Sequence, residues 1–262
     1  MIRAALALGL AFLWAPVLLL CLYAFSASRE PFVWGGFSLR WFASLAANER
    51  LLEALWLSLR VAAGAATLAT LLGGAAGWAL ARHGRFRGRA LFGALAGAPL
   101  ILPEVVLGLA LLLFFVALQS LTGWPAQRGA GTVLLAHATL GLAYVTVVVQ
   151  ARIAGLDPAL EEAALGLGAS PLAAFGTVTL PLLAPSLACG WLLAFVLSLD
   201  DVVLASFVSG PGGTTLPVFL FSQLRLGMTP EGNALAVLML GLAGLGWLAL
   251  GWLGLAWWRR RA

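Results

Sequence analysis

Three acidic side chains lie inside long apolar runs of this 262-residue chain. Glu104 lies in the run Ala90–Leu118, and Asp200 and Asp201 lie in the run Leu180–Ser209. An Asp at the centre of a membrane costs roughly 2.5–3.5 kcal/mol on insertion scales, and such residues usually face a protein interior or a water-filled path. A carboxylate with aromatic neighbours can bind a protonated amine through charge pairing and cation–π contact. The three acids are therefore candidate contacts for a cationic solute; the alternative is that they pair with Arg or with backbone donors at helix ends.

Catalytic and metal chemistry have little support in the sequence. All 15 basic residues are Arg, so the chain lacks the Lys that a phosphate-binding G-x-x-x-x-G-K-[ST] loop requires. Neither H-E-x-x-H nor G-x-S-x-G occurs, and we interpret His137 as an interhelical polar residue rather than a ligand. Cys21 and Cys189 lie in apolar runs and are interpreted as small hydrophobic residues. We expect no catalytic residue, no metal site and no cofactor in this chain.

The elements that position these acids are membrane helices. Only 10% of the residues are charged, and 62% are hydrophobic with a mean hydropathy of +1.02; ordinary globular proteins have roughly 25% charged residues. A spanning helix needs roughly 20 mostly apolar residues. We therefore expect an all-α polytopic membrane protein with six transmembrane helices, at Ala4–Phe25, Val61–Ala81, Ala90–Leu118, Thr132–Val149, Leu180–Ser209 and Ala234–Trp258. The first run also resembles a signal peptide, but its 22 residues exceed the usual apolar core of about 7–15, so we expect it to be retained.

The arginines predict the orientation of these helices. With a cytoplasmic N-terminus, nine arginines lie inside and six outside, and the cluster Arg82–Arg89 falls on an inner loop. The outer loop that contains Arg29 to Arg50 counts less, because long loops weigh less in the positive-inside rule. Both termini are therefore expected in the cytoplasm. The net charge of +5 reflects this topology, and we expect no nucleic-acid partner.

Helix geometry predicts how deep the acids lie. At 1.5 Å per residue along straight helices, Glu104 lies about 21 Å beyond the start of its run and Asp200 about 30 Å beyond the start of its own. Both acids then fall in the outer half of the membrane. Adjacent Asp200 and Asp201 point about 100° apart on a helix, so both can hardly face one path. Prolines inside these two runs predict bends or late helix starts, at Pro99, Pro103, Pro181 and Pro185.

Small faces are present at Gly73-x-x-x-Gly77 and Gly93-x-x-x-Gly97. Small residues at this spacing let membrane helices approach closely. Because the chain has 31 Gly, we interpret both pairs as packing within the bundle rather than as a dedicated dimer motif.

One polar segment, Asp157–Phe175, interrupts the apolar sequence on the expected cytoplasmic face. Asp157-Pro158 is a strong helix start, since a capping carboxylate precedes a residue suited to the first helical position. Gly166 and Gly168 weaken the helix and allow a left-handed stop, and Ser170-Pro171 repeats the capped start. The segment therefore predicts two short helices joined by a glycine turn. Such short helices are marginal in water and need a packing partner.

The spacing in this segment resembles a family motif. Glu162-Ala163-Ala164, three residues, Gly168, and then Leu180-Pro181 match the EAA pattern of membrane subunits of binding-protein-dependent ABC importers. The segments Pro99–Gly108 and Ser198–Leu238 are similar to polyamine (putrescine/spermidine) importer permeases, so the resemblance covers most of the chain. It implies a type I ABC importer permease fold, as a single transmembrane permease domain over 1–262. In that domain, 1–55 forms the first span and periplasmic loop and 56–258 forms the core permease helices.

The resemblance also implies partners and roles. The chain is expected in a bacterial inner membrane with a homologous second permease, two ATPase subunits that bind ATP and Mg²⁺, a periplasmic polyamine-binding protein and membrane lipid. The polar segment would be the coupling helix that contacts the ATPase. The residues implied in coupling are Glu161, Glu162, Ala163, Ala164, Gly168, Ala169, Leu180 and Pro181; those of the substrate path remain Glu104, Asp200 and Asp201. Two alternatives stay open: an ion-coupled secondary transporter of a small cation, and an ABC importer permease for another substrate.

Overall fold

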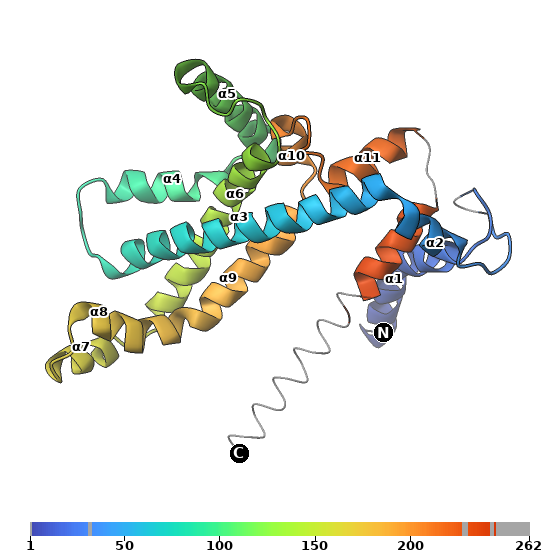
Figure 1. Cartoon of the computed structure of the whole chain (residues 1–262). Helices are drawn as coiled ribbons and strands as arrows, with labels where there is room; N and C mark the ends of the chain where they lie inside the picture. The colour runs from blue at the N-terminus through green and yellow to red at the C-terminus, as the bar shows by residue number, and fades with distance from the viewer. Residues whose placement is uncertain (1, 31–32, 227–229, 242–243, 245–262) are drawn as a thin grey trace. The chain divides into compact units, whose positions relative to one another are not determined.

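The computed structural model describes residues 2–30, 33–226, 230–241 and 244. In these residues the chain is helical, with one isolated β-bridge between Ser26 and Phe37. It forms two compact units, one of Met1–Glu53 with Leu220–Ala262 and one of Ala54–Phe219. Figure 1 labels the helices: α1 (Ile2–Ala24), α2 (Arg40–Ala47), α3 (Glu49–Arg82), α4 (Arg89–Ile101), α5 (Glu104–Thr122), α6 (Ala130–Ala154), α7 (Ala159–Gly166), α8 (Pro171–Ala174), α9 (Leu180–Asp200), α10 (Val203–Val208) and α11 (Leu216–Leu226). The single domain expected over 1–262 stays a prediction.

Five helices within the described residues are long and apolar enough to cross a membrane. They are α1, α3, α5, α6 and a continuous helix Pro171–Asp200 that includes α8 and α9. The all-α membrane architecture expected from composition is therefore confirmed. Most of the sixth expected span, Ala234–Trp258, lies outside the described residues, although a helix covers Glu231–Gly241. The count of six spans stays a prediction.

The single helix expected over Ala90–Leu118 is wrong. The chain forms α4 and then α5, and Leu102 between them has an extended backbone at ψ 136°. The cause is Pro103, whose ring disfavours the helical conformation of the preceding residue. Glu104 consequently lies in the first turn of α5, so its depth measured along one straight helix is also wrong.

The fifth expected span differs at both ends. The helix begins earlier than Leu180, because α8 continues through a π-helical turn at Phe175–Thr179 into α9. At the other end α9 stops at Asp200, Asp201 is extended at ψ 126°, and the separate short helix α10 follows. The break places the two adjacent acids in different environments.

Glycines of α3 make close contact with α6 at the centre of the larger unit. A Cβ added at Gly73 would lie 2.6 Å from the Leu142 carbonyl oxygen, and one at Gly77 would lie 2.7 Å from the Thr146 carbonyl oxygen. The packing expected for this glycine pair is confirmed. A Cβ at Gly97 would meet nothing within 4 Å, so the same expectation is wrong for Gly97, whereas one at Gly93 would contact Leu80 of α3 at 3.7 Å.

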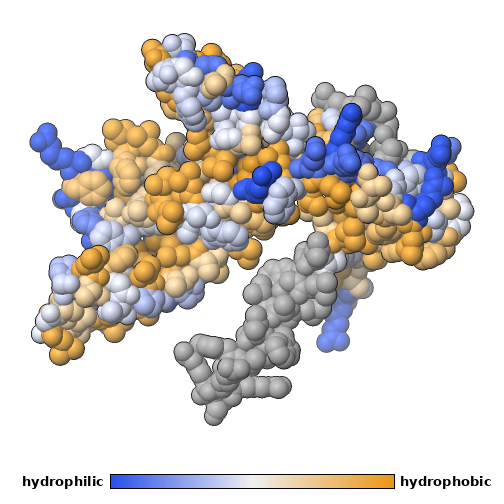
Figure 2. Space-filling view, viewed as in Figure 1, coloured by the Kyte–Doolittle hydropathy of each residue, from blue (hydrophilic) through white to orange (hydrophobic). Residues whose placement is uncertain are grey.

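The core of the larger unit lies where α3, α6 and α9 meet. Its buried members include Ala69, Val145 and Leu183 from these three helices. A second cluster joins α3, α5, α6 and α10 and includes Val61, Phe115 and Val208. Apolar side chains also cover much of the outside of this unit, and Figure 2 shows hydrophilic residues gathered where the chain turns between α3 and α4. This distribution fits helices whose outer faces contact lipid or other membrane helices.

Candidate coupling helix and membrane acids

The polar segment folds as two short helices, as the sequence predicts. Asp157 accepts a hydrogen bond from the Ala159 amide at 3.0 Å before α7 begins. Ser170 accepts one from the Ala173 amide at 3.3 Å at the start of α8. Figure 1 shows the pair at one end of the larger unit, beyond the ends of α6 and α9.

The glycine of the EAA pattern ends α7 in a left-handed turn. Gly168 has φ +91°, and its amide donates to the Leu165 carbonyl at 2.9 Å. The Ala169 amide donates to the Ala164 carbonyl at 3.1 Å. These two bonds form a Schellman motif, which satisfies carbonyls at the helix end and favours Gly at the position of positive φ. The fixed spacing from Ala164 to Gly168 thus has a local structural reason.

A clamp that the sequence analysis missed holds α7 to the membrane helices. The Arg82 guanidinium at the end of α3 lies 2.7 Å from a Glu161 carboxylate oxygen, and the Thr179 hydroxyl donates to that same oxygen at 3.0 Å. Both charged side chains are about one quarter exposed, at 28% and 22%. Glu161 therefore connects α7 to α3 and to the π-helical turn before α9. Neighbouring Glu162 is exposed, and its carboxylate makes no hydrogen bond or ion pair with any residue in the described part of the chain.

The outer surface of the helix pair is apolar. No residue of α7 is buried, and the exposed leucines include Leu160, Leu165, Leu167 at 90% exposure and Leu172 at 81%. Leu180 and Pro181, which complete the EAA pattern, open α9 and are also exposed. The helix pair is therefore fixed to the membrane helices through the Glu161 carboxylate and exposes apolar side chains on its other side. Such a surface is suited to docking on a partner protein.

Of the three membrane acids, Asp201 is buried in a polar network. It accepts hydrogen bonds from the Leu204 and Ala205 amides at 3.2 and 2.7 Å, and so caps α10. Its other contact is His137 Nε2 at 3.0 Å, and His137 Nδ1 lies 2.6 Å from the Ser198 hydroxyl. The His137 side chain is 1% exposed, which confirms its interhelical role. The backbone partners of the Asp201 carboxylate are those that the alternative interpretation of the membrane acids predicts, whereas its His137 partner was not predicted.

Glu104 and Asp200 are exposed in the isolated chain. The segments that carry these two acids, the start of α5 and the end of α9, are connected by packing around α10. Asp200 immediately precedes the anchored Asp201, and Leu204 of α10 belongs to one buried cluster with Leu107, which lies one turn after Glu104. The network at His137 therefore fixes the backbone beside one exposed acid and, through α10, supports the helix that carries the other.

Comparison with known proteins identifies the family. Residues 69–257, which include the helix pair and both acidic segments, match the family described as "Binding-protein-dependent transport system inner membrane component". The chain belongs to this family. It is 52% identical over 240 residues to the putrescine transport system permease protein PotI of Escherichia coli (strain K12), covering 92% of this chain and 85% of the relative. It is 41% identical over 234 residues to the spermidine/putrescine transport system permease protein PotC of Haemophilus influenzae, covering 89% and 88%.

A solved structure supports the fold of this permease. A bacterial ABC transporter involved in the import of the acidic polysaccharide alginate superposes with a TM-score of 0.69, covering 95% of each chain at 15% identity. The permease is therefore a multi-pass membrane protein of the ABC importer class, and its relatives are transport subunits rather than enzymes.

Proposed function

We propose that this permease is one of two homologous membrane subunits of an ATP-driven importer that carries a polyamine, putrescine in the first instance, across a bacterial inner membrane. The observation that carries the proposal is the 52% identity to a putrescine permease over 92% of the chain. The similarity to spermidine/putrescine permeases, at 41% identity, makes spermidine the second candidate.

The energy source in this proposal is a separate ATPase chain, present in two copies, that binds ATP and Mg²⁺. The sequence has no Lys for a phosphate-binding loop. The apolar open face of α7 and α8 and the exposed Glu162 are the surface that would enter a groove of the ATPase. Two of the eight coupling residues named from the sequence then have different roles: Glu161 anchors the helix pair, and Glu162 faces the partner.

The substrate path in this proposal contains Glu104 and Asp200. Both carboxylates are exposed in the isolated chain, and each lies next to a helix break where backbone geometry changes. A diprotonated diamine delivered by a periplasmic binding protein would pair with them through charge-assisted hydrogen bonds. Asp201 takes part indirectly, because its hydrogen bonds fix the backbone at the break between α9 and α10. The termini and the helix pair lie on the cytoplasmic side.

The test is uptake of labelled putrescine and spermidine into vesicles that contain the permease pair, the ATPase and the binding protein. Wild type should take up putrescine only with ATP. Glu104→Gln should lower uptake by about tenfold or more, because a hydrogen bond to a charged group contributes roughly 1.5–3 kcal/mol. Gly168→Asp should leave the permease inserted but prevent the ATPase from co-purifying. Uptake driven by a proton or sodium gradient without ATP would refute the proposal in favour of secondary transport.

A further inference from the structure

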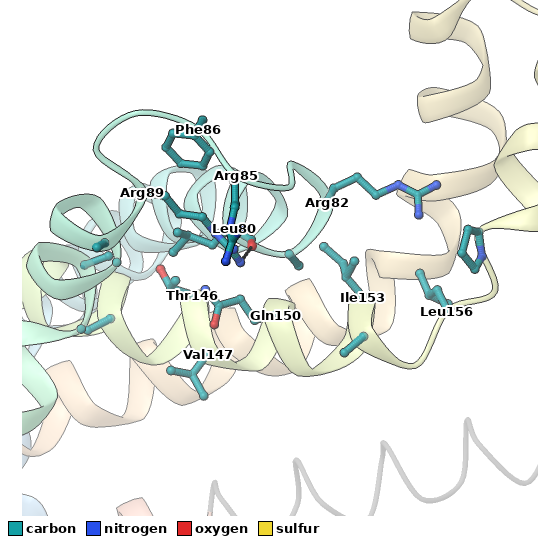
Figure 3. A pocket seen from close by; sticks show the side chains of 18 residues that line it. Leu80, Arg82, Arg85, Phe86, Arg89, Thr146, Val147, Gln150, Ile153 and Leu156 are labelled. Carbon is teal, nitrogen blue, oxygen red and sulfur yellow. Dashed lines mark hydrogen bonds between the residues drawn. The ribbon is translucent and has the colours of Figure 1, made fainter.

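A large cavity with charged and apolar ends lies between the ends of α3, α4 and α6. Its volume is about 1130 Å³, and all of its lining residues belong to the larger unit. Figure 3 shows Arg85 and Arg89 on the α3–α4 side, facing the α6 segment that carries Thr146 and Gln150. Its lining includes Arg82 and Pro158 beside the helix pair, but no residue of α7 or α8 and none of the three membrane acids.

Two of the three positive charges at this cavity are not neutralised within the described residues. Of the three arginines that line it, Arg82 is paired with Glu161, and Arg89 donates to the Leu80 carbonyl oxygen at 2.8 Å. Arg85 makes no ion pair or hydrogen bond with the part of the chain that the structure describes, and no acidic residue lines the cavity. The half-buried Gln150 amide likewise has no hydrogen-bond partner among these residues. Arg85, Arg89 and Gln150 can together donate to an anion.

The rest of the cavity is apolar and is kept open by small side chains. Gly93, Ala96 and Gly97 of α4 face it, with Val147 and Ile153 of α6. A Cβ at Gly97 would meet nothing within 4 Å, and one at Gly93 would meet only Leu80, at 3.7 Å. Gly97 therefore does not serve helix packing, because it borders the open space of the cavity.

The two ends of the cavity lie at different depths. The spanning helices α3 and α6 end at Arg82 and Ala154, and the apolar sequence of α4 begins directly after Arg89. The arginines therefore lie where the helices leave the membrane, and the glycine-lined part lies on the membrane side. An occupant must carry an anion at the surface and hydrocarbon below it. A polyamine is excluded because Arg85 and Arg89, which have no acidic partner, repel it.

We propose that this cavity binds an anionic phospholipid, with its phosphate at Arg85, Arg89 and Gln150 and part of an acyl chain along Gly93 and Gly97. Basic pockets between membrane helices on the cytoplasmic side are suited to such headgroups. This inference rests on the proposed function in one respect, the orientation that places the cavity on the cytoplasmic side of the membrane. A bound lipid there would brace α4 against α6, next to the helix that carries the Arg82 clamp.

In the experiment, the purified permease–ATPase complex is incorporated into discs of phosphatidylcholine with or without phosphatidylglycerol. Mass spectrometry then counts the phosphatidylglycerol molecules that stay bound to the complex. Arg85→Gln should lower the retained phosphatidylglycerol about tenfold, because Arg85 lines the cavity and a hydrogen bond between charged groups contributes about a factor of that size. Arg85→Lys should retain most of it. The matched control is Arg87→Gln, which removes the same charge from the same loop but lies outside the cavity lining and should change nothing.

A second variant tests the apolar end without changing any charge. Gly97→Leu places an apolar side chain in the cavity at a position where its Cβ meets nothing within 4 Å, and it should also lower retention. Equal losses of retained phosphatidylglycerol in Arg85→Gln and Arg87→Gln would overturn the site, because they would show that the lipid is attracted to the basic surface in general. Full retention in Gly97→Leu, or displacement of the lipid by inorganic phosphate alone, would overturn the lipid assignment. A wild-type complex that transports putrescine but retains no phosphatidylglycerol would overturn this inference and leave the proposed function intact. A complex that retains the lipid but does not transport putrescine would overturn the proposed function and leave this inference intact.

Discussion

Substitution of Gly168 by Ala tests whether the turn that ends α7 is needed for coupling. The φ of +91° is a conformation that L-residues rarely adopt, and left-handed backbone costs them roughly 1–2 kcal/mol. A Cβ at this position would meet nothing within 4 Å, so the cost is one of backbone conformation without a clash. If docking on the ATPase requires the intact Schellman turn, a cost of this size lowers the apparent affinity by roughly 5- to 30-fold.

The matched control is two residues away. Gly166 is the last residue of α7, and a Cβ there also meets nothing within 4 Å. Gly166→Ala should therefore leave binding unchanged or improve it, since Ala is favoured over Gly in a helix by about 1 kcal/mol. Gly168→Asn should fall between wild type and Gly168→Ala, because Asn tolerates the left-handed conformation better than Ala does.

The assay is titration of the ATPase onto the permease pair in lipid discs, with ATP hydrolysis stimulated by the loaded binding protein as a second readout. Thermal unfolding of the membrane part should be the same in all four proteins, because Gly168 is exposed. Equal ATPase affinities for Gly166→Ala and Gly168→Ala would refute the role of the turn. A large fall in melting temperature for Gly168→Ala alone would show that the segment supports the bundle rather than a partner.

Two further substitutions test the packing that positions the acids. Asp201→Ala should lower the melting temperature of the detergent-purified permease, because it removes a helix cap of about 0.5–2 kcal/mol and leaves buried His137 Nε2 without a partner at about 1–3 kcal/mol. Asp200→Ala is its control, and a similar loss for this exposed neighbour would contradict the network. Gly73→Ala should also lower the melting temperature, by overpacking against the α6 backbone at about 1–3 kcal/mol. Gly97→Ala should not, and equal effects of the two alanines would contradict the assigned helix contact.

Local chemistry made the polar segment predictable. Caps at Asp157 and Ser170 and the stop at Gly168 depend on residues within a few positions of each other, and all three form as the sequence predicts. The break before Pro103 was only partly predictable. Two prolines in that run predicted a bend, but Pro99 lies within α4, whereas the helix ends before Pro103. Which proline ends a helix depends on the packing around it, and sequence periodicity does not contain that information.

Contacts between distant residues account for what the sequence analysis missed. Glu161 and Arg82 are 79 positions apart, and His137 is 64 positions from Asp201. A weaker signal was available for the second pair. A His, a Ser and an Asp within apolar helices must find partners where water is absent, and Ser198 and Asp201 are spaced as neighbours along one helix. That requirement predicts a network, but only the fold identifies its members.

The fold connects the two candidate sites through one helix. From Pro171 to Asp200 the chain is continuously helical, with Glu161 fixed to its beginning through Thr179 and the anchored Asp201 directly after its end. Its middle packs closely against α6, where a Cβ added at Gly190 would lie only 3.3 Å from a Val145 methyl carbon. A helix packed in this way moves as a unit, because close-packed interiors transmit displacement rather than absorb it. If the ATPase displaces α7 as proposed, the helix Pro171–Asp200 carries that displacement along its whole length to the break beside Asp200. The buried His137 network at this break must then accommodate the movement.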